Sequence, residues 1–170
     1  MFKITAMILI VSAFFVAGKC VASFQQKRVS VLETVILMII SGESRLRYAC
    51  LPMSDLLKSL NENESLSALG FIRTCREKVC FGTDFYSAWK ESIESETEFC
   101  SLLGKSAKSL ISMGSELGST DLEGQLSCCE YYRKIFESDL EEQREKSMKY
   151  SKLFPSMGLL LGVSAAIFMV

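Results

Sequence analysis

The cysteines are the side chains of this sequence most able to do chemistry. There are seven of them: Cys20, Cys50, Cys75, Cys80, Cys100, Cys128 and Cys129. Cysteine thiolates bind zinc and can be oxidised reversibly. The vicinal pair Cys128 and Cys129 could therefore act as a redox switch. The chain has no histidine to complete a zinc site, however, and cysteines at helical positions commonly fill the core as small apolar residues. We therefore expect no metal site, and a membrane-bound redox sensor or regulator using Cys128 and Cys129 is the alternative function.

Several common catalytic motifs are missing from the sequence, so catalysis would have to rest on carboxylates, tyrosines or cysteines. There is no histidine to act as a base, no glycine-rich phosphate loop and no serine nucleophile elbow. The acidic run at 137–142 has basic residues on either side of it, which is typical of a solvated helix face. The net charge of -1, from 19 basic and 20 acidic residues, leaves no basic face for nucleic acid. We expect no enzyme, no cofactor, no small-molecule substrate and no nucleic-acid partner.

Both ends of the chain are apolar and predict its domain organisation. Residues 4–18 and 153–170 carry no charge, and such runs approach the length of about 20 residues that spans a bilayer. We expect a transmembrane helix at 1–23, a cytoplasmic helical bundle at 24–152 and a transmembrane helix at 153–170. Basic residues flank the inner ends of both runs, which places the middle in the cytoplasm by the positive-inside rule. The alternative is a cleaved signal peptide, which would leave a secreted helical protein with a tail anchor.

The middle of the chain is predicted to be all-α. Only two prolines occur, and no alternation of period two indicates a strand. Apolar residues at steps of three and four predict helices over 24–40, 54–60, 66–81, 85–93 and 97–117. Gly42 could end or kink the first of these, or that helix could continue through Arg47, while Ser54 and Asp84 are placed to cap later ones. The single tryptophan, Trp89, is expected in the core.

A joint near the end of the chain, MGSELGSTDLEGQ at 113–125, stops one helix and starts another. Gly118 is expected to adopt a left-handed conformation at the end of the first helix. Thr120 and Glu123 fit a capping box that starts the second. The last helix carries apolar residues in steps of three and four from Leu122 to Phe154 and could continue into the membrane span. The short joint predicts a long antiparallel helical hairpin.

Residues of the loop after the first helix, of the middle and of the joint form a recognisable pattern. They are Tyr48, Pro52, Trp89, Gly114, Leu117, Gly118, Asp121 and Gln125. With the two apolar ends, this pattern resembles the stage III sporulation protein AB family of endospore-forming bacteria over nearly the whole chain. Two positions depart from it: Arg45 stands where the family tends to be acidic, and Met53 replaces the usual leucine after proline.

The resemblance implies a structural component of the channel-like assembly between mother cell and forespore. It places the chain in the mother-cell membrane around the forespore, with two spans and a cytoplasmic domain similar to the platform proteins of type II secretion. The partners it implies are the stage III AA protein, which is a cytosolic secretion-type ATPase, and other stage III sporulation membrane proteins. The exposed charges of the last helix and the loop from Tyr48 to Pro52 are the expected docking surfaces, while Gly118 and Asp121 are expected to shape the hairpin.

Overall fold

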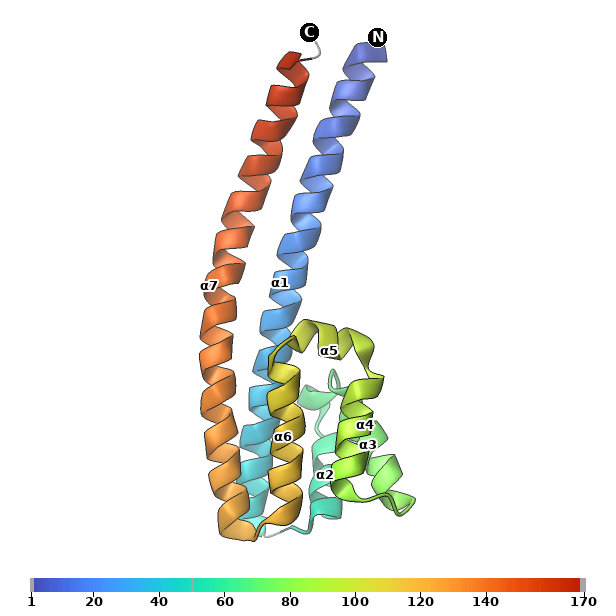
Figure 1. The fold of residues 1–170 in the computed structure, drawn as a ribbon, viewed down its shortest axis with the longest axis vertical. Coiled ribbons are helices and arrows are strands. Elements are labelled where there is room, and N and C mark those ends of the chain that lie inside the picture. The colour runs from blue at the N-terminus through green and yellow to red at the C-terminus, as the bar shows by residue number, and fades with distance from the viewer. Residues whose placement is uncertain (1, 50, 169–170) are drawn as a thin grey trace. The chain divides into compact units, whose positions relative to one another are not determined.

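The computed structural model describes residues 2–49 and 51–168, and the side chains of 12, 13, 16, 19–49 and 51–150. All regular structure in these residues is helical, which confirms the predicted all-α class. The elements are α1 (Phe2–Ala49), α2 (Met53–Asn61), the 3-10 helix η1 (Glu64–Leu66), α3 (Gly70–Cys80), α4 (Phe85–Ser95), α5 (Thr97–Leu103), α6 (Ser106–Ser119) and α7 (Leu122–Phe168) (Figure 1).

Two compact units divide the chain. One comprises Met1–Val29 with Glu141–Val170, and the other, which we call the helical unit, comprises Ser30–Leu140. In the part of the chain that the structure describes, no helix has both the length and the apolar character needed to cross a membrane. The side chains at 153–170, and most of those at 1–23, lie outside the described residues. The two spans and the boundaries at 24 and 152 therefore stay predictions.

The inner face of α1 forms one wall of the core of the helical unit. Leu32, Val35, Ile39 and Leu46 lie on this face and are at most 1% exposed. Gly42 does not end the helix, which continues to Ala49. A glycine costs a helix interior about 1 kcal/mol, whereas burying a leucine such as Leu46 stabilises by roughly 1.5–3 kcal/mol. Packing of the next turn therefore outweighs the weak propensity of Gly42.

Helix α2 contributes the predicted apolar face but begins differently from the prediction. Leu56, Leu57 and Leu60 are buried, as their spacing indicates. Ser54 lies inside the helix and does not cap it, because α2 starts at Met53. The carbonyl of Pro52 accepts the first helical hydrogen bond, from the amide of Leu56 at 2.9 Å.

Aromatic rings gather around α4 in the centre of the helical unit. The Asp84 carboxylate caps α4 by accepting a hydrogen bond from the Ser87 amide at 3.2 Å, which confirms that predicted cap. Trp89 is 3% exposed, which confirms its core position. Its ring lies edge-on to Phe71, with centroids 5.2 Å apart, an arrangement that aromatic pairs favour.

The predicted single helix over 97–117 is wrong, because the chain forms two helices there. Gly104 separates α5 from α6 with φ of 59° and ψ of -120°, a conformation that essentially only glycine adopts. Phe99 and Leu103 before the break and Leu110 after it are all buried. Because these apolar residues keep a helical spacing across Gly104, the sequence pattern does not indicate that the chain changes direction there.

Candidate functional site

The joint between α6 and α7 is held by side chains that satisfy the helix ends. Oδ1 of Asp121 accepts a hydrogen bond from the Gly124 amide at 3.0 Å and so caps α7. The side-chain amide of Gln125 reaches back and donates to the carbonyl of Leu117 at 3.0 Å, which satisfies the end of α6. Thr120 does not form the predicted capping box, because its hydroxyl donates to the carbonyl of Glu116 at 3.2 Å.

The two glycines of the joint allow α4 to approach α6. A Cβ added at Gly114 would overlap the ring of Trp89 and lie 2.6 Å from its Cγ. The same ring donates a hydrogen bond from Nε1 to the carbonyl of Leu110 at 2.9 Å. A Cβ at Gly118 would lie 3.0 Å from Cδ1 of Phe85. Gly118 is part of α6 and does not have a positive φ, so its predicted left-handed conformation is wrong. The small size of Gly118 instead leaves room for the ring of Phe85.

Polar contacts pair α6 with the first part of α7 in antiparallel order. The Ser106 hydroxyl donates to Oδ2 of Asp139 at 2.7 Å, and Lys105 forms an ion pair with Oδ1 of the same carboxylate at 3.3 Å. Nearer the joint, the Tyr132 hydroxyl donates to the Glu116 carboxylate at 2.7 Å. Burial, followed by this bond to Glu116, raises the pKa of the Tyr132 hydroxyl. The predicted hairpin is confirmed, although α6 is shorter than expected.

The structure brings most of the predicted site residues together. Those that meet at this junction of α4, α6 and α7 are Trp89, Gly114, Leu117, Gly118, Asp121 and Gln125. The other two serve elsewhere. Tyr48 lies in the last turn of α1 and is 83% exposed, and Pro52 precedes α2. At the junction, the contacts of the motif residues therefore fix how the helices meet.

The vicinal cysteines lie inside the helical unit. Cys128 and Cys129 are 5% and 2% exposed. Burial is the main cause that raises the pKa of Cys128 to about 12, and it raises the pKa of Cys129 to about 11, with Glu116 and Glu43 as further causes. Because the thiolate is the reactive form, these thiols are poorly suited to a redox switch. Among the described residues, no group of three or more potential ligands is placed to hold a metal ion.

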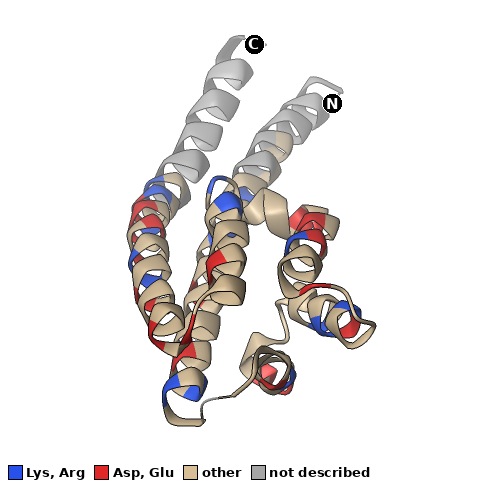
Figure 2. Cartoon of the chain, turned by 60° about the horizontal axis from the view of Figure 1, so that its bottom comes forward, with Lys and Arg blue, Asp and Glu red and all other residues tan. Residues whose placement is uncertain are grey.

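The charged side chains of the described surface are mixed in sign. Figure 2 shows basic and acidic residues interleaved along α7. Several of these charges are neighbours on the same helix, such as Lys134 and Glu130 at 2.8 Å and Lys146 and Glu142 at 2.6 Å. Exposed pairs of this kind contribute little stability, with a median of about 0–1 kcal/mol.

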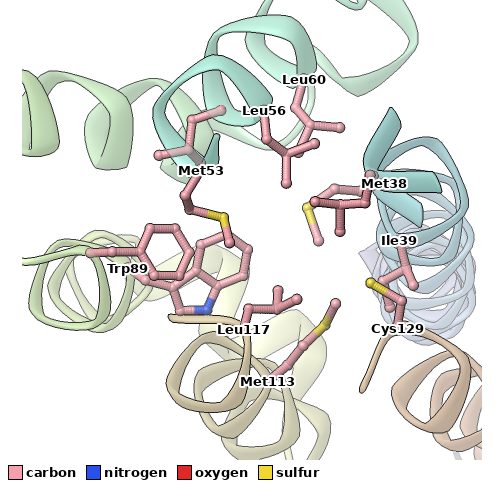
Figure 3. Close-up of a pocket in the computed structure, with 13 residues that line it drawn as sticks. Met38, Ile39, Met53, Leu56, Leu60, Trp89, Met113, Leu117 and Cys129 are labelled. Atoms are coloured by element: carbon pink, nitrogen blue, oxygen red, sulfur yellow. The ribbon is translucent and has the colours of Figure 1, made fainter. Parts of the chain in front are cut away.

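An apolar recess opens in the helical unit between α1, α2, α4, α6 and α7. Side chains that line it include Met38, Met53, Trp89, Met113 and Cys129 (Figure 3). The space open to the centre of a water molecule is about 20 Å³, which is room for about one water and far below a small-molecule site. The recess is a packing gap, and Met53, one of the two departures from the family pattern, borders it.

Sequence reasoning missed Phe81, the most exposed large apolar side chain among the described residues of the helical unit. Phe81 is 91% exposed, compared with 83% for Tyr48 and 60% for Tyr131. It caps the end of α3, immediately before Gly82, which has a positive φ of 92°. The sequence did contain a signal: Phe81 stands directly before Gly82 and does not share the spacing of the buried apolar residues of α3.

The fold and the joint define an all-helical protein whose motif residues hold helices together. The chain belongs to the stage III sporulation protein AB family, because the family model described as "Stage III sporulation protein AB" matches residues 3–170. The chain is therefore a stage III sporulation protein. No curated protein and no solved structure matches it significantly.

Proposed function

We propose that this chain is the membrane-anchored platform of a secretion-like complex between mother cell and forespore, where it docks the stage III AA ATPase. In this proposal the apolar segments at its two ends span the mother-cell membrane around the forespore. The helical unit then stands in the mother-cell cytoplasm, where a cytosolic ATPase can reach it. Other stage III sporulation membrane proteins are its further partners.

One observation carries the proposal: the family-motif residues that meet at the junction all serve to fix the shape of the helical unit. Gly114 and Gly118 admit the rings of α4, while Asp121 and Gln125 satisfy the helix ends. A motif that maintains a rigid shape is what a docking platform needs, because a preorganised surface loses less entropy on binding. The distribution of charge adds support, since basic residues flank the inner ends of both apolar segments.

The first experiment is calorimetry of the full chain in detergent micelles against the stage III AA ATPase at physiological salt. We expect saturable binding, with empty micelles and a micelle-inserted protein of unrelated fold as controls. A well-folded chain that shows no binding would contradict the platform role.

The topology is tested separately with a membrane-impermeant thiol reagent applied to intact vegetative cells that produce the chain in their plasma membrane. Cys80, which is exposed in the helical unit, should react only after the membrane is opened. A cysteine introduced by Val170→Cys should react in intact cells, because the proposed topology puts the chain's last residue outside. Reaction of Cys80 in intact cells would refute the cytoplasmic placement.

A further inference from the structure

The net charge of -1 is the sum of two compact units of opposite sign. The terminal unit, as we call Met1–Val29 with Glu141–Val170, has eight basic and three acidic residues in its sequence, a formal charge of +5. The helical unit has eleven basic and seventeen acidic residues, a formal charge of -6. Three carboxylates cannot neutralise eight cations, so the terminal unit stays basic whichever ion pairs form within it.

The basic residues of the terminal unit, apart from Lys3, gather beside its uncharged runs. On α1 they fall within 19–28, directly after the run at 4–18, and on α7 they fall within 144–152, directly before the run at 153–170. Figure 2 shows several of them as blue segments of α7. The described side chains of this group that are exposed are Lys19, Lys27, Arg144, Lys146 and Lys149. Both helices therefore present positive charge to solvent next to an apolar end.

Exposed apolar side chains lie among these charges. They are Val16, which is 65% exposed, Val21 at 38%, Phe24 at 41% and Met148 at 58%. Each stands within three residues of a lysine in the sequence. Lysine and arginine can lay their aliphatic stems along apolar surface while the charged head stays in water. Exposed apolar and basic side chains on the same helix surface are typical of protein segments at a membrane interface.

The combination of charge and apolar surface selects one occupant among those that a basic surface attracts. A second terminal unit is disfavoured, because it brings a charge of the same sign. A nucleic acid would match the charge, but its phosphate backbone gives exposed Val16, Phe24 and Met148 no apolar contact. An anionic phospholipid matches both features, because its phosphate complements the basic side chains and its acyl chains complement the apolar ones.

We propose that the terminal unit recognises anionic phospholipids, whose headgroup phosphates bind the basic side chains of 19–28 and 144–152. The exposed apolar side chains then lie against the acyl chains. This inference rests on the proposed function, because it requires the apolar runs to be in the membrane, and it adds the class of lipid that surrounds the chain. A basic residue near an anionic surface contributes about fivefold in affinity, which corresponds to about 1 kcal/mol.

The test is native mass spectrometry of the full chain in a non-ionic detergent, titrated with dioleoyl phosphatidylglycerol or with dioleoyl phosphatidylcholine. The two lipids share their acyl chains, so the comparison isolates the headgroup charge. We expect the wild type to bind phosphatidylglycerol at least about tenfold more tightly than phosphatidylcholine, and higher salt to reduce the difference.

A double variant, Lys27→Gln with Lys149→Gln, tests the assigned residues. It should bind phosphatidylglycerol about 25-fold more weakly, and its affinity for phosphatidylcholine should stay unchanged. The matched control is Lys58→Gln with Lys90→Gln, which removes the same charge from exposed positions of the helical unit. We expect the control to change the affinity for phosphatidylglycerol less than about twofold, because these charges lie outside the proposed site. Both variants should fold normally, since all four lysines are exposed.

Flotation of the full chain with vesicles of pure phosphatidylcholine separates the inference from the proposed function. A chain that does not float lacks a membrane anchor, which would overturn both. A chain that floats but binds the two lipids equally, or that loses equal affinity in the test and control variants, would overturn only the inference. Tighter binding of a single-stranded oligonucleotide than of phosphatidylglycerol would also overturn it, by assigning the basic surface to nucleic acid.

Discussion

Replacing Gly114 by alanine tests the close packing of α4 on α6. The new methyl group would overlap the ring of Trp89, so the ring has to move and lose its hydrogen bond to the carbonyl of Leu110. Overpacking costs about 1–3 kcal/mol and a lost hydrogen bond about 1 kcal/mol, while alanine improves helix propensity by about 1 kcal/mol. We expect a net loss of about 2 kcal/mol in the free energy of unfolding, or about 30-fold in the folding equilibrium.

The assay is urea unfolding of the full chain in mild detergent, followed by the fluorescence of Trp89, which is the only tryptophan. Gly42→Ala is the matched control. It also replaces a buried helical glycine, but a Cβ at Gly42 would meet nothing within 4 Å, because that position borders the recess. We expect Gly42→Ala to stabilise by up to about 1 kcal/mol through helix propensity. Equal stability of the two variants would refute the contact between Gly114 and Trp89.

Two further predictions concern the joint and the cysteines. Asp121→Ala removes the cap of α7 and should lower the free energy of unfolding by about 1 kcal/mol in the same urea assay; an unchanged midpoint would show that the cap is not formed. In the folded chain at pH 8, iodoacetamide should modify exposed Cys80 and leave buried Cys128 and Cys129 intact by mass spectrometry. Burial raises the pKa of Cys128 to about 12 and that of Cys129 to about 11, both above the ordinary value of 9.0. The stability that the two buried, protonated thiols contribute is therefore present below pH 9. It is lost as the pH rises toward their pKa values in the folded chain. Rapid modification of either thiol under native conditions would contradict their burial.

Periodic features of the sequence predicted α2, α4 and the first part of α7 well, whereas the predicted helix over 66–81 is divided between η1 and α3. The steps of three and four along α7 and the cluster of leucines in α2 required only that apolar residues share one side of a helix. The break at Gly104 could not be predicted in this way, because Phe99, Leu103 and Leu110 keep a helical spacing across it. The break is caused by the backbone conformation of Gly104, which a hydropathy pattern does not report.

The residues of the joint were predicted more reliably than their individual roles. Thr120 and Asp121 are both good capping residues, and each is followed by a plausible first turn. The choice depends on a tertiary contact, since Gln125 binds the carbonyl of Leu117 and thereby fixes where α6 stops. The role of Gly118 also depends on another helix, because a Cβ at this position would crowd the ring of Phe85. Neither contact can be inferred from local sequence.

The position of the motif residues constrains how any partner is recognised. Trp89, Gly114 and Leu117 are buried, so a partner cannot read them directly, and substitutions there would impair binding only by changing the fold. Recognition must therefore use side chains outside the buried motif. This separation gives a diagnostic pattern. Gly114→Ala should lower stability and the binding of any partner together, because its effect passes through the fold, and a Gly114→Ala chain that lost binding at unchanged stability would contradict this.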